Sequence, residues 1–289
     1  MLDGETATDV SLVRDLIRTQ FPRWQDLPVR EVAHGGTSNA MYRLGDDLAV
    51  RLPRREWARD SASKEASIVP VVLPHLPVAV PEPLELGVPG EGYPYEWSVV
   101  RWLDGETAPF EAVGDNTPFR LAELVLALHG IDAGGRPWTT GRGRLDAEAD
   151  DEAVRRCIDQ IGGSPLLTGL WEESLAAPRW SGPLRWLHAD LHEGNLLFTG
   201  GELSGVIDWG SAGVGDPAAN LMTAWLYLDE RGRKQFRREV GLDDATWVRA
   251  QGWALHLAVL ALPYYRETNK FLAGIASRTL DQLCSGWDD

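Results

Sequence analysis

Cysteine is scarce in this chain of 289 residues, because only Cys157 and Cys284 are present. Two cysteines exclude the disulfide framework that supports many small secreted domains. Lysine is also scarce, since Lys64, Lys234 and Lys270 are the only lysines among 28 basic residues. This skew indicates a compositional bias, so an arginine at a given position is weak evidence of a role.

Long hydrophobic runs are absent. The longest apolar stretch, Trp253 to Leu262, is interrupted by His256 and followed by Pro263. A membrane span needs about 20 apolar residues, so this stretch predicts a buried helix and not a membrane span. Residues 1–10 are acidic and lack the pattern of a secretory signal. We expect a cytoplasmic protein that does not enter a membrane.

Positive charge is also in deficit. Acidic residues number 43 against 28 basic ones, for a net charge of −15. A nucleic-acid partner normally requires the opposite balance, so none is expected. Hydrophobic residues make up 44% and charged residues 25%, the composition of a globular protein. The length fits one large domain or two lobes.

The first part of the chain predicts a small lobe rich in β-strands. Apolar residues recur at helical spacing from Asp9 to Phe21, with Thr8 or Asp9 as the N-cap. Glycine-bearing turns between short apolar runs predict an antiparallel meander. The predicted elements are a helix over 9–21, strands over 29–33, 40–44 and 48–52, a helix over 61–73 and a strand over 96–103. Asp104 and Gly105 end the last strand and predict a hinge.

The rest of the chain predicts a larger, mostly helical lobe. Thr117 and Pro118 begin a helix, with the proline where its missing N–H costs nothing. Two or more helices are expected between residues 150 and 177, then a β segment over 184–208, then further helices. The predicted class is α+β, with an antiparallel-sheet lobe over 1–102 and a helical lobe over 103–289.

One segment carries a spacing that indicates chemistry. It reads His188-x-Asp190-x4-Asn195, followed 13 residues later by Asp208-x-Gly210 behind an apolar run. Protein kinases have the same spacing in their catalytic loop and metal-binding motif. Phosphoryl transfer needs an aligned acceptor hydroxyl and neutralised phosphate charge. The pattern therefore predicts a kinase site.

Each of these residues suits one task in phosphoryl transfer. Asp190 can orient and accept the acceptor proton, while Asn195 and Asp208 offer the oxygen ligands that Mg²⁺ prefers. We expect Gly210 to let the chain turn sharply after the metal ligand. His188 is interpreted as a structural residue that hydrogen-bonds the loop, since the carboxylate already fills the role of base.

Three features of the first lobe fall in the right order for a nucleotide site. The loop Gly35-Gly36-Thr37-Ser38-Asn39 between two strands can cover phosphates with its backbone amides and Ser38. Arg51 on the third strand can contact phosphates while Glu65 on the next helix fixes its position. A surface ion pair is the alternative for these two residues.

The third feature is the strand that ends near the hinge. We expect it to join the lobes and to offer backbone groups to the edge of an adenine base. Arg101 and Leu103 are the predicted contacts.

At this point the chain resembles the aminoglycoside phosphotransferase family, the antibiotic kinases of the protein-kinase-like fold. The resemblance rests on the segments ending at Leu197, Gly210 and Ala218, with support from residues 35–40 and 50–54, and it covers roughly 25–285. It implies a bilobal fold and phosphorylation of a small-molecule hydroxyl by ATP or GTP with Mg²⁺. Carried over by position, Asp190 is the catalytic base, and Asn195 and Asp208 are the metal ligands.

One residue departs from the usual kinase pattern. Most kinases have lysine where this chain has Arg51, and an arginine keeps the charge with a different donor geometry. We interpret Arg51 as a nucleotide contact, with compositional bias as the neutral explanation.

The acceptor stays open between several classes. The acidic charge favours an aminoglycoside, and the aromatic residues of the second lobe favour a macrolide. A metabolite such as choline, homoserine or a sugar is the alternative, and a catalytically silent nucleotide-binding protein is a third hypothesis. Packing is the main interpretation of the aromatic residues, with the lining of an acceptor cleft as the alternative for five of them: Trp225, Tyr227, Trp253, Tyr264 and Tyr265. Asp216 precedes Pro217 and a helical run, which predicts a helix cap. The oligomeric state is left open.

Overall fold

The structure is a computed structural model that describes residues 5–32, 38–139, 142–143 and 147–285. Contacts divide the chain into two compact units. The first unit comprises residues 1–74, 79–104 and 205–210, and the second comprises residues 75–78, 105–204 and 211–289.

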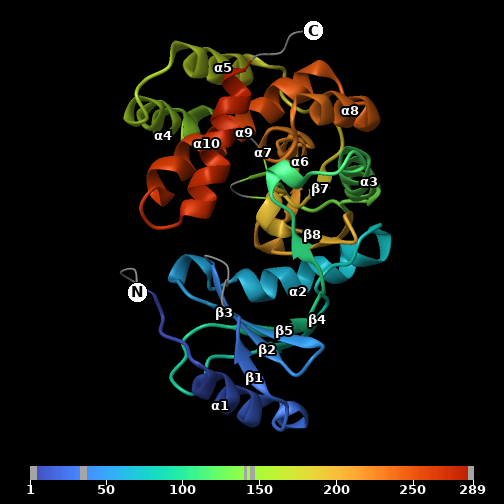
Figure 1. Cartoon of the computed structure of the whole chain (residues 1–289), viewed down its shortest axis with the longest axis vertical. Coiled ribbons are helices and arrows are strands. Elements are labelled where there is room, and N and C mark those ends of the chain that lie inside the picture. Colours follow the sequence, from blue (N-terminus) through green and yellow to red (C-terminus); the bar gives the residue numbers. More distant parts are fainter. Residues whose placement is uncertain (1–4, 33–37, 140–141, 144–146, 286–289) are drawn as a thin grey trace. The chain divides into compact units, whose positions relative to one another are not determined.

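The first unit is built on a five-stranded sheet (Figure 1). Its strands, in spatial order, are β1 (Val29–Glu31), β2 (Asn39–Leu44), β3 (Leu48–Pro53), β5 (Trp97–Arg101) and β4 (Pro83–Gly87). All four pairings are antiparallel, which confirms the predicted meander. In the register of the sheet, Arg51 on β3 lies between Met41 on β2 and Ser98 on β5.

Helix α1 (Val10–Gln20) closes the core of this sheet. The Asp9 side chain accepts a hydrogen bond from the Leu12 N–H at 2.8 Å, so Asp9 is the N-cap. Phe21 packs edge-on against Trp97, with 5.3 Å between ring centroids. Gly87 is required beside this indole, because a Cβ there would lie 2.0 Å from the Trp97 ring.

Helix α2 (Ser61–Val72) contacts β3, β4 and β5. Residues 205–210 belong to the same unit although they are remote in sequence. The Val206 N–H donates to the Ala79 carbonyl at 2.9 Å, and Ala79 forms a parallel bridge with Gly205. The first unit is therefore completed by residues 205–210, which follow its other residues by about 100 positions in the sequence.

The second unit is mostly helical, with two small sheets (Figure 1). Its helices are α3 (Thr117–Gly130), α4 (Ala147–Gln160), α5 (Pro165–Ala176), α6 (Ala218–Leu221), α7 (Thr223–Leu226), α8 (Glu230–Val240), α9 (Asp244–Tyr265) and α10 (Lys270–Cys284). One sheet pairs β7 (Arg185–Leu187) with β10 (Gly213–Gly215), and the other orders β6 (Glu106–Thr107), β8 (Leu196–Thr199) and β9 (Glu202–Val206). Short 3-10 helices lie at Pro22–Trp24, Glu56–Ala58, Leu73–His75, Phe110–Ala112, Glu193–Asn195 and Trp209–Ser211.

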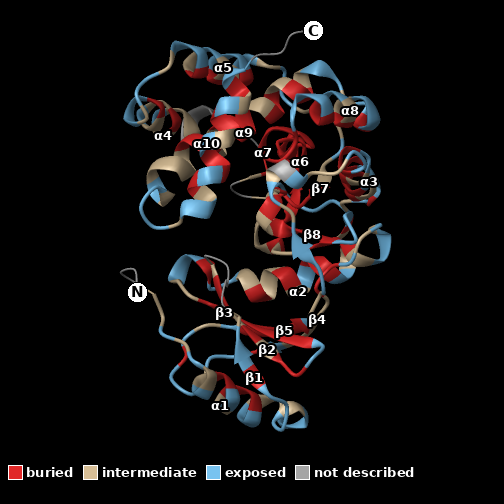
Figure 2. Ribbon diagram, in the orientation of Figure 1, coloured by how far each residue is buried: buried red, intermediate tan, exposed pale blue. Residues whose placement is uncertain are grey.

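Helix α9 is the centre of the second unit, since it contacts α4, α5, α6, α7 and α10. Figure 2 shows that α6 and α7, which α9 contacts, are buried throughout. The predicted buried helix over this stretch is part of α9, which continues past Pro263 to Tyr265. Pro263 lacks the N–H of a helical residue, but the Arg266 N–H still bonds to the Leu262 carbonyl at 3.0 Å.

The aromatic residues considered for an acceptor cleft separate into two groups. Trp225, Tyr227 and Trp253 are fully buried in the core, so packing is their role and the cleft interpretation is wrong for them. Tyr264 at the end of α9 is 59% exposed, and Tyr265 is half-buried.

The architecture is the predicted α+β class, with an antiparallel sheet in one unit and a helical second unit. Among the described residues, no helix combines the length and the apolar character that a membrane crossing requires.

Candidate active site

The predicted catalytic loop, residues 188–195, lies in the second unit between β7 and β8. Its backbone is strained at Ala189, where φ is +60° without glycine. Asn220 on α6 stabilises this conformation, because its side-chain oxygen accepts from the N–H groups of His188 at 2.9 Å and Ala189 at 3.2 Å. The strained residue immediately precedes Asp190.

Asn220 is itself fixed by two further contacts. Its amide nitrogen donates to the Trp186 carbonyl at 3.1 Å and lies 3.2 Å from Nε2 of His129. Burial lowers the pKa of His129 to about 3, aided by Arg185, so the ring is neutral and accepts this bond. His188 is fully buried, as expected for a structural residue. Sequence reasoning missed Asn220, whose only signal is its position on the helix after Asp216-Pro217.

Asp190 is contacted by an arginine that sequence reasoning also missed. Arg142 Nη1 donates to Asp190 Oδ1 at 2.5 Å and to the Ala189 carbonyl at 2.6 Å. Burial alone would raise the pKa of Asp190, but the Arg142 guanidinium and then His192 outweigh it and bring the pKa to about 2. Asp190 is therefore an ionised carboxylate at neutral pH.

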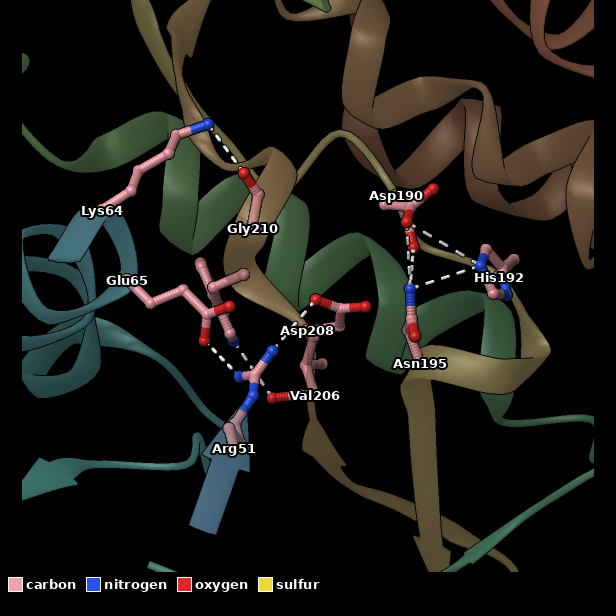
Figure 3. Close-up of polar contacts among 10 residues, drawn as sticks. Arg51, Lys64, Glu65, Asp190, His192, Asn195, Val206, Asp208 and Gly210 are labelled. Atoms are coloured by element: carbon pink, nitrogen blue, oxygen red, sulfur yellow. Dashed lines mark hydrogen bonds and ion pairs between the residues drawn. The ribbon is translucent and has the colours of Figure 1, made fainter. Parts of the chain in front are cut away.

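Asn195 lies beside Asp190 in the same loop (Figure 3). Its amide nitrogen donates to the Asp190 backbone carbonyl at 2.9 Å and lies 3.3 Å from Asp190 Oδ2. His192 Nε2 is 3.3 Å from the same nitrogen, while His192 Nδ1 accepts from the Gly194 N–H at 3.1 Å. The contacts of Asn195 within the loop thus use its amide nitrogen.

Glu193 anchors the middle of the loop to the surrounding helices. Its buried carboxylate accepts from the Phe110 N–H at 3.0 Å and from Arg278 on α10 at 2.9 Å. Gly194 lies against Phe271 at the start of α10, since a Cβ there would meet that ring at 3.0 Å. The loop is therefore fixed at both ends and in its centre.

The first unit holds the other predicted polar group (Figure 3). Arg51 forms a buried ion pair with Glu65, and its other amino group donates to Asp208 Oδ1 at 3.2 Å. The surface ion pair considered for these residues is wrong, since Arg51 and Glu65 are both buried. Lys64 donates to the Gly210 carbonyl at 2.7 Å, which joins α2 to residues 205–210.

The left-handed residue in this turn is Asp208, with φ of +62°, whereas Gly210 is absent from the positive-φ residues of the described chain. Gly210 lies in the short 3-10 helix Trp209–Ser211 that follows Asp208, so the chain turns there without a conformation that requires glycine. A left-handed aspartate is less costly than most residues there, because aspartate is enriched in this region.

Charge in this group is set by burial and by two carboxylates sharing one arginine. Burial lowers the pKa of Arg51, but Glu65 and Asp208 raise it more, so the guanidinium stays charged. Burial raises the pKa of Glu65 to about 7, while Arg51 acts in the opposite direction. Glu65 Oε1 has no hydrogen-bond partner among the described residues.

The remaining predicted nucleotide contacts are dispersed. Gly35 and Gly36 lie outside the described residues. Ser38 accepts the Arg54 N–H on its carbonyl at 2.8 Å, and Asn39 is buried in β2. Arg101 is exposed and pairs with Glu82, and its backbone N–H already donates to the Glu82 carbonyl at 2.9 Å. Leu103 is half-buried beyond the end of β5.

Asp216 caps a helix, as predicted. Its Oδ1 accepts from the Ala218 N–H at 3.0 Å. The same carboxylate also forms a buried two-point ion pair with Arg249 on α9, at 2.6 and 3.1 Å. Asp216 therefore connects the start of α6 to the central helix.

The oxygen donors present suit magnesium. The described residues contain no group of three or more acidic, histidine or cysteine side chains able to hold a metal by themselves. Asp208 is a carboxylate with 34% of its side chain exposed, and Asn195 makes its bond to the Asp190 carbonyl with its amide nitrogen and not with its oxygen. Mg²⁺ is commonly bound by one or two protein oxygens and completed by phosphates and water. These residues fit that pattern.

Comparison with known proteins places this geometry in a family. The sequence profile of the phosphotransferase enzyme family (APH) matches residues 29–253. The chain is 26% identical to thiamine kinase of Escherichia coli O157:H7 over 237 residues, covering 76% of this chain and 73% of that protein.

Solved structures share the fold. The GDP and kanamycin complex of APH(2")-IIia superposes with a TM-score of 0.75 at 19% identity, covering 94% of this chain and 98% of that one. The macrolide 2'-phosphotransferase MphH from Brachybacterium faecium gives a TM-score of 0.61 at 22% identity, covering 94% and 98%. With the family profile spanning most of its length, the chain belongs to the phosphotransferase enzyme family and is an enzyme of that type.

Proposed function

We propose that this enzyme transfers the γ-phosphoryl group of ATP or GTP to a hydroxyl of a small molecule, with Mg²⁺, in the cytoplasm. The acceptor we propose first is an antibiotic, either an aminoglycoside or a macrolide. The observation that carries the proposal is the ionised Asp190 held beside Asn195 on a strained, buried loop. Such strain is characteristic of functional sites.

Asp190 acts as the base in this proposal. Its carboxylate accepts a hydrogen bond from the acceptor hydroxyl and orients that oxygen toward the γ-phosphorus. As the new O–P bond forms, the hydroxyl proton passes to Asp190. Asn220 and Glu193 keep the loop in position, so the base is preorganised before the acceptor binds.

The nucleotide phosphates are held by Arg51 in this proposal, with Glu65 fixing the guanidinium from α2. Asn195 and Asp208 would hold Mg²⁺, which neutralises phosphate charge when bound. Because Arg51 already donates to Asp208, the charge of that carboxylate is balanced before a cation is bound.

Relatives support a nucleotide cosubstrate and leave two acceptor classes. The structural relatives include a complex with GDP and kanamycin and a macrolide 2'-phosphotransferase, which favours an antibiotic acceptor. The relative named thiamine kinase favours the alternative, a metabolite kinase acting on a hydroxyl of a small natural compound such as choline, homoserine or a sugar.

A screen of nucleotide consumption against a panel of acceptors tests the proposal. The panel holds aminoglycosides, macrolides and hydroxylated metabolites, with ATP and GTP in parallel and Mg²⁺ present or removed by chelation. We expect one compound class to gain the mass of one phosphoryl group, and Asp190→Asn to abolish the gain. A panel in which only metabolites are phosphorylated would overturn the antibiotic assignment. A protein that binds nucleotide and modifies nothing would favour a catalytically silent protein.

A further inference from the structure

We propose that Arg142 is a catalytic residue that contacts the transferred phosphoryl group while it holds Asp190. This inference rests on the proposed kinase function and adds a residue to its transition state. Arg142 lies on the segment between α3 and α4, remote in sequence from the catalytic loop.

The contacts of Arg142 use one end of its guanidinium. Nη1 makes both bonds, to Asp190 Oδ1 and to the Ala189 carbonyl. Nε and Nη2 have no partner within the part of the chain that the structure describes. The Arg142 side chain is 34% exposed, so a bound group can reach part of it. An arginine carries five N–H donors in a fixed plane, so it can serve two acceptors at once.

Thr139 and Gly143, two described residues on either side of Arg142, bond to β10 and to the residue that follows it. The Thr139 N–H donates to the Val214 carbonyl at 2.9 Å, and the Thr139 hydroxyl accepts from the Val214 N–H at 2.6 Å. The Gly143 carbonyl accepts from the Asp216 N–H at 2.9 Å.

Glycines in β10 allow this close packing. A Cβ at Gly213 would lie 1.9 Å from the Thr139 hydroxyl, and a Cβ at Gly215 would lie 2.2 Å from the Gly143 carbonyl. The contacts of Thr139 and Gly143 thus hold the backbone on both sides of Arg142, and this keeps the Arg142 side chain next to Asp190.

The geometry of in-line transfer brings the phosphoryl group close to Asp190 and Arg142. The acceptor oxygen lies within hydrogen-bond reach of Asp190, and the γ-phosphorus lies one bond beyond that oxygen in the transition state. A guanidinium that bonds to Asp190 through one amino group is therefore within reach of the phosphoryl oxygens through its other donors.

The negative charge of the phosphoryl oxygens and of Asp190 favours a cation beside them. The transferred group bears negative oxygens, and the Asp190 carboxylate beside it repels them. Residues 188–195 include neither lysine nor arginine. Arg142 donates directly to the base, whereas His192 lies 3.9 Å from Asp190 Oδ2 and carries charge only when it is protonated.

The proposed step balances without another reactant. The acceptor O–H bond breaks and its proton goes to Asp190, while the acceptor oxygen forms the new bond to phosphorus. The bridging P–O bond of the nucleotide breaks, and its electron pair stays on the leaving diphosphate oxygen. Arg142 remains protonated throughout.

The test compares binding of a transition-state mimic with binding of the ground state. Wild type and variants are titrated with ADP or GDP plus aluminium fluoride and Mg²⁺, and with a non-hydrolysable triphosphate analogue. We expect Arg142→Ala to weaken the fluoride complex about 10²-fold, the scale for one lost transition-state donor, and to change analogue binding less than about 2-fold. Arg136→Ala is the matched control, because it removes the same charge from the same unit, and it should change neither.

A second background separates direct contact from an effect through Asp190. In Asp190→Asn, Arg142→Ala should still weaken the fluoride complex by about 10-fold or more if Arg142 touches the phosphoryl group. Free guanidinium ion should restore part of the loss, and Arg142→Lys should keep part of the affinity. Equal fluoride-complex binding by Asp190→Asn with and without Arg142 would overturn the inference and leave Arg142 a positioning residue. Wild-type protein that binds neither nucleotide form would overturn the proposed function instead.

Discussion

Arg51 donates a hydrogen bond to Asp208 across 3.2 Å, between residues 157 positions apart in sequence. Its other amino group pairs with Glu65, so one buried guanidinium serves two carboxylates. The residue expected to bind phosphates is therefore bonded to a residue expected to bind Mg²⁺. Mg²⁺ and phosphate together provide partners for both groups, which couples their binding in the proposed function.

Replacing Arg51 should weaken binding of a triphosphate more than binding of a nucleoside, because Coulomb attraction acts on the phosphates. Arg51→Ala should reduce triphosphate affinity about 10-fold or more, on the scale of a charged hydrogen bond. Arg51→Lys should also lose affinity, because an ammonium cannot bond Glu65 and Asp208 with the same fork. Calorimetry with ATP, GTP and the nucleosides gives these affinities.

Glu65 should act mainly through Arg51, so the loss in the double variant should be smaller than the sum of the two single losses. Melting temperatures of all variants serve as the control, since an unpaired buried charge destabilises the fold. Equal affinity of wild type and Arg51→Ala for triphosphate would remove Arg51 from the nucleotide site.

Asp190→Asn should reduce turnover by ~10²–10⁴, the usual effect of losing a general base. Asparagine has nearly the same shape and retains an oxygen for Arg142, so the fold and nucleotide affinity should be unchanged. The measurement is kcat with the acceptor that the panel identifies, alongside nucleotide titration. Near-normal turnover would assign the base role elsewhere.

Asp208→Asn should abolish Mg²⁺-dependent turnover with little change in melting temperature. Asparagine is the appropriate variant because it tolerates the positive φ at this position better than alanine. Without nucleotide, the wild type should bind Mg²⁺ weakly, since the phosphates complete such sites. Full activity in a chelator, or in the variant, would contradict the kinase mechanism.

His129 should make the protein less stable below pH 6.5. Its folded pKa is about 3, below the ordinary 6.5, so the unfolded chain binds more protons and stability falls as the pH falls. At pH 5 the loss is ~2 kcal/mol relative to pH 7, from 1.36 kcal/mol per unit. Urea unfolding of wild type and His129→Gln at both values measures it.

The effect of His129 is the difference between wild type and His129→Gln in the stability that each loses from pH 7 to pH 5. Glu65 has a raised pKa and titrates in the opposite sense, but it is present in both. A variant that loses as much stability as wild type between pH 7 and pH 5 would show that His129 is not the group responsible.

Arg249→Ala should destabilise the second unit by about 3–5 kcal/mol, because Asp216 would keep an uncompensated buried charge. Arg249 also donates to the Pro178 carbonyl at 2.6 Å and to the Thr246 hydroxyl at 3.1 Å, which adds unpaired acceptors. Replacing both partners, as Asp216→Asn with Arg249→Met, should recover part of the loss. Denaturant unfolding measures all three proteins.

The sequence predicted those elements that depend on residues close together in the chain, such as turns, helix caps and short motifs. Glycine turns between short apolar runs predicted the antiparallel pairing of β1, β2 and β3, and the Asp9 cap predicted the start of α1. The spacing around Asp190 predicted the loop, because its chemistry depends on positions close together in sequence. The strands β6 and β10 escaped prediction, because Glu106–Thr107 and Gly213–Gly215 contain no run of apolar residues that would mark a strand.

Contacts between distant segments left no signal in one sequence. Arg142 reaches Asp190 over 48 positions, and Asn220 reaches Ala189 over 31. Neither residue belongs to a motif, and the arginine-rich composition conceals Arg142 further. Burial of Trp225 and Tyr227 likewise depends on how α7 packs, which composition does not report. Position in the packed structure, and not residue type, distinguishes these cases.

Because residues 205–210 belong to the first unit, this unit cannot finish folding early in translation. Arg51 and Glu65 are translated long before Asp208. A nascent chain therefore carries this buried pair before the Asp208 carboxylate is available to Arg51. Domains commonly fold from the N-terminus as they leave the ribosome, but here the first unit is complete only after Gly210 has emerged. A fragment ending at Asp104 lacks the Asp208 carboxylate and the Gly210 carbonyl that Arg51 and Lys64 contact. The first unit therefore cannot be completed until residues 105–204 of the second unit have been synthesised.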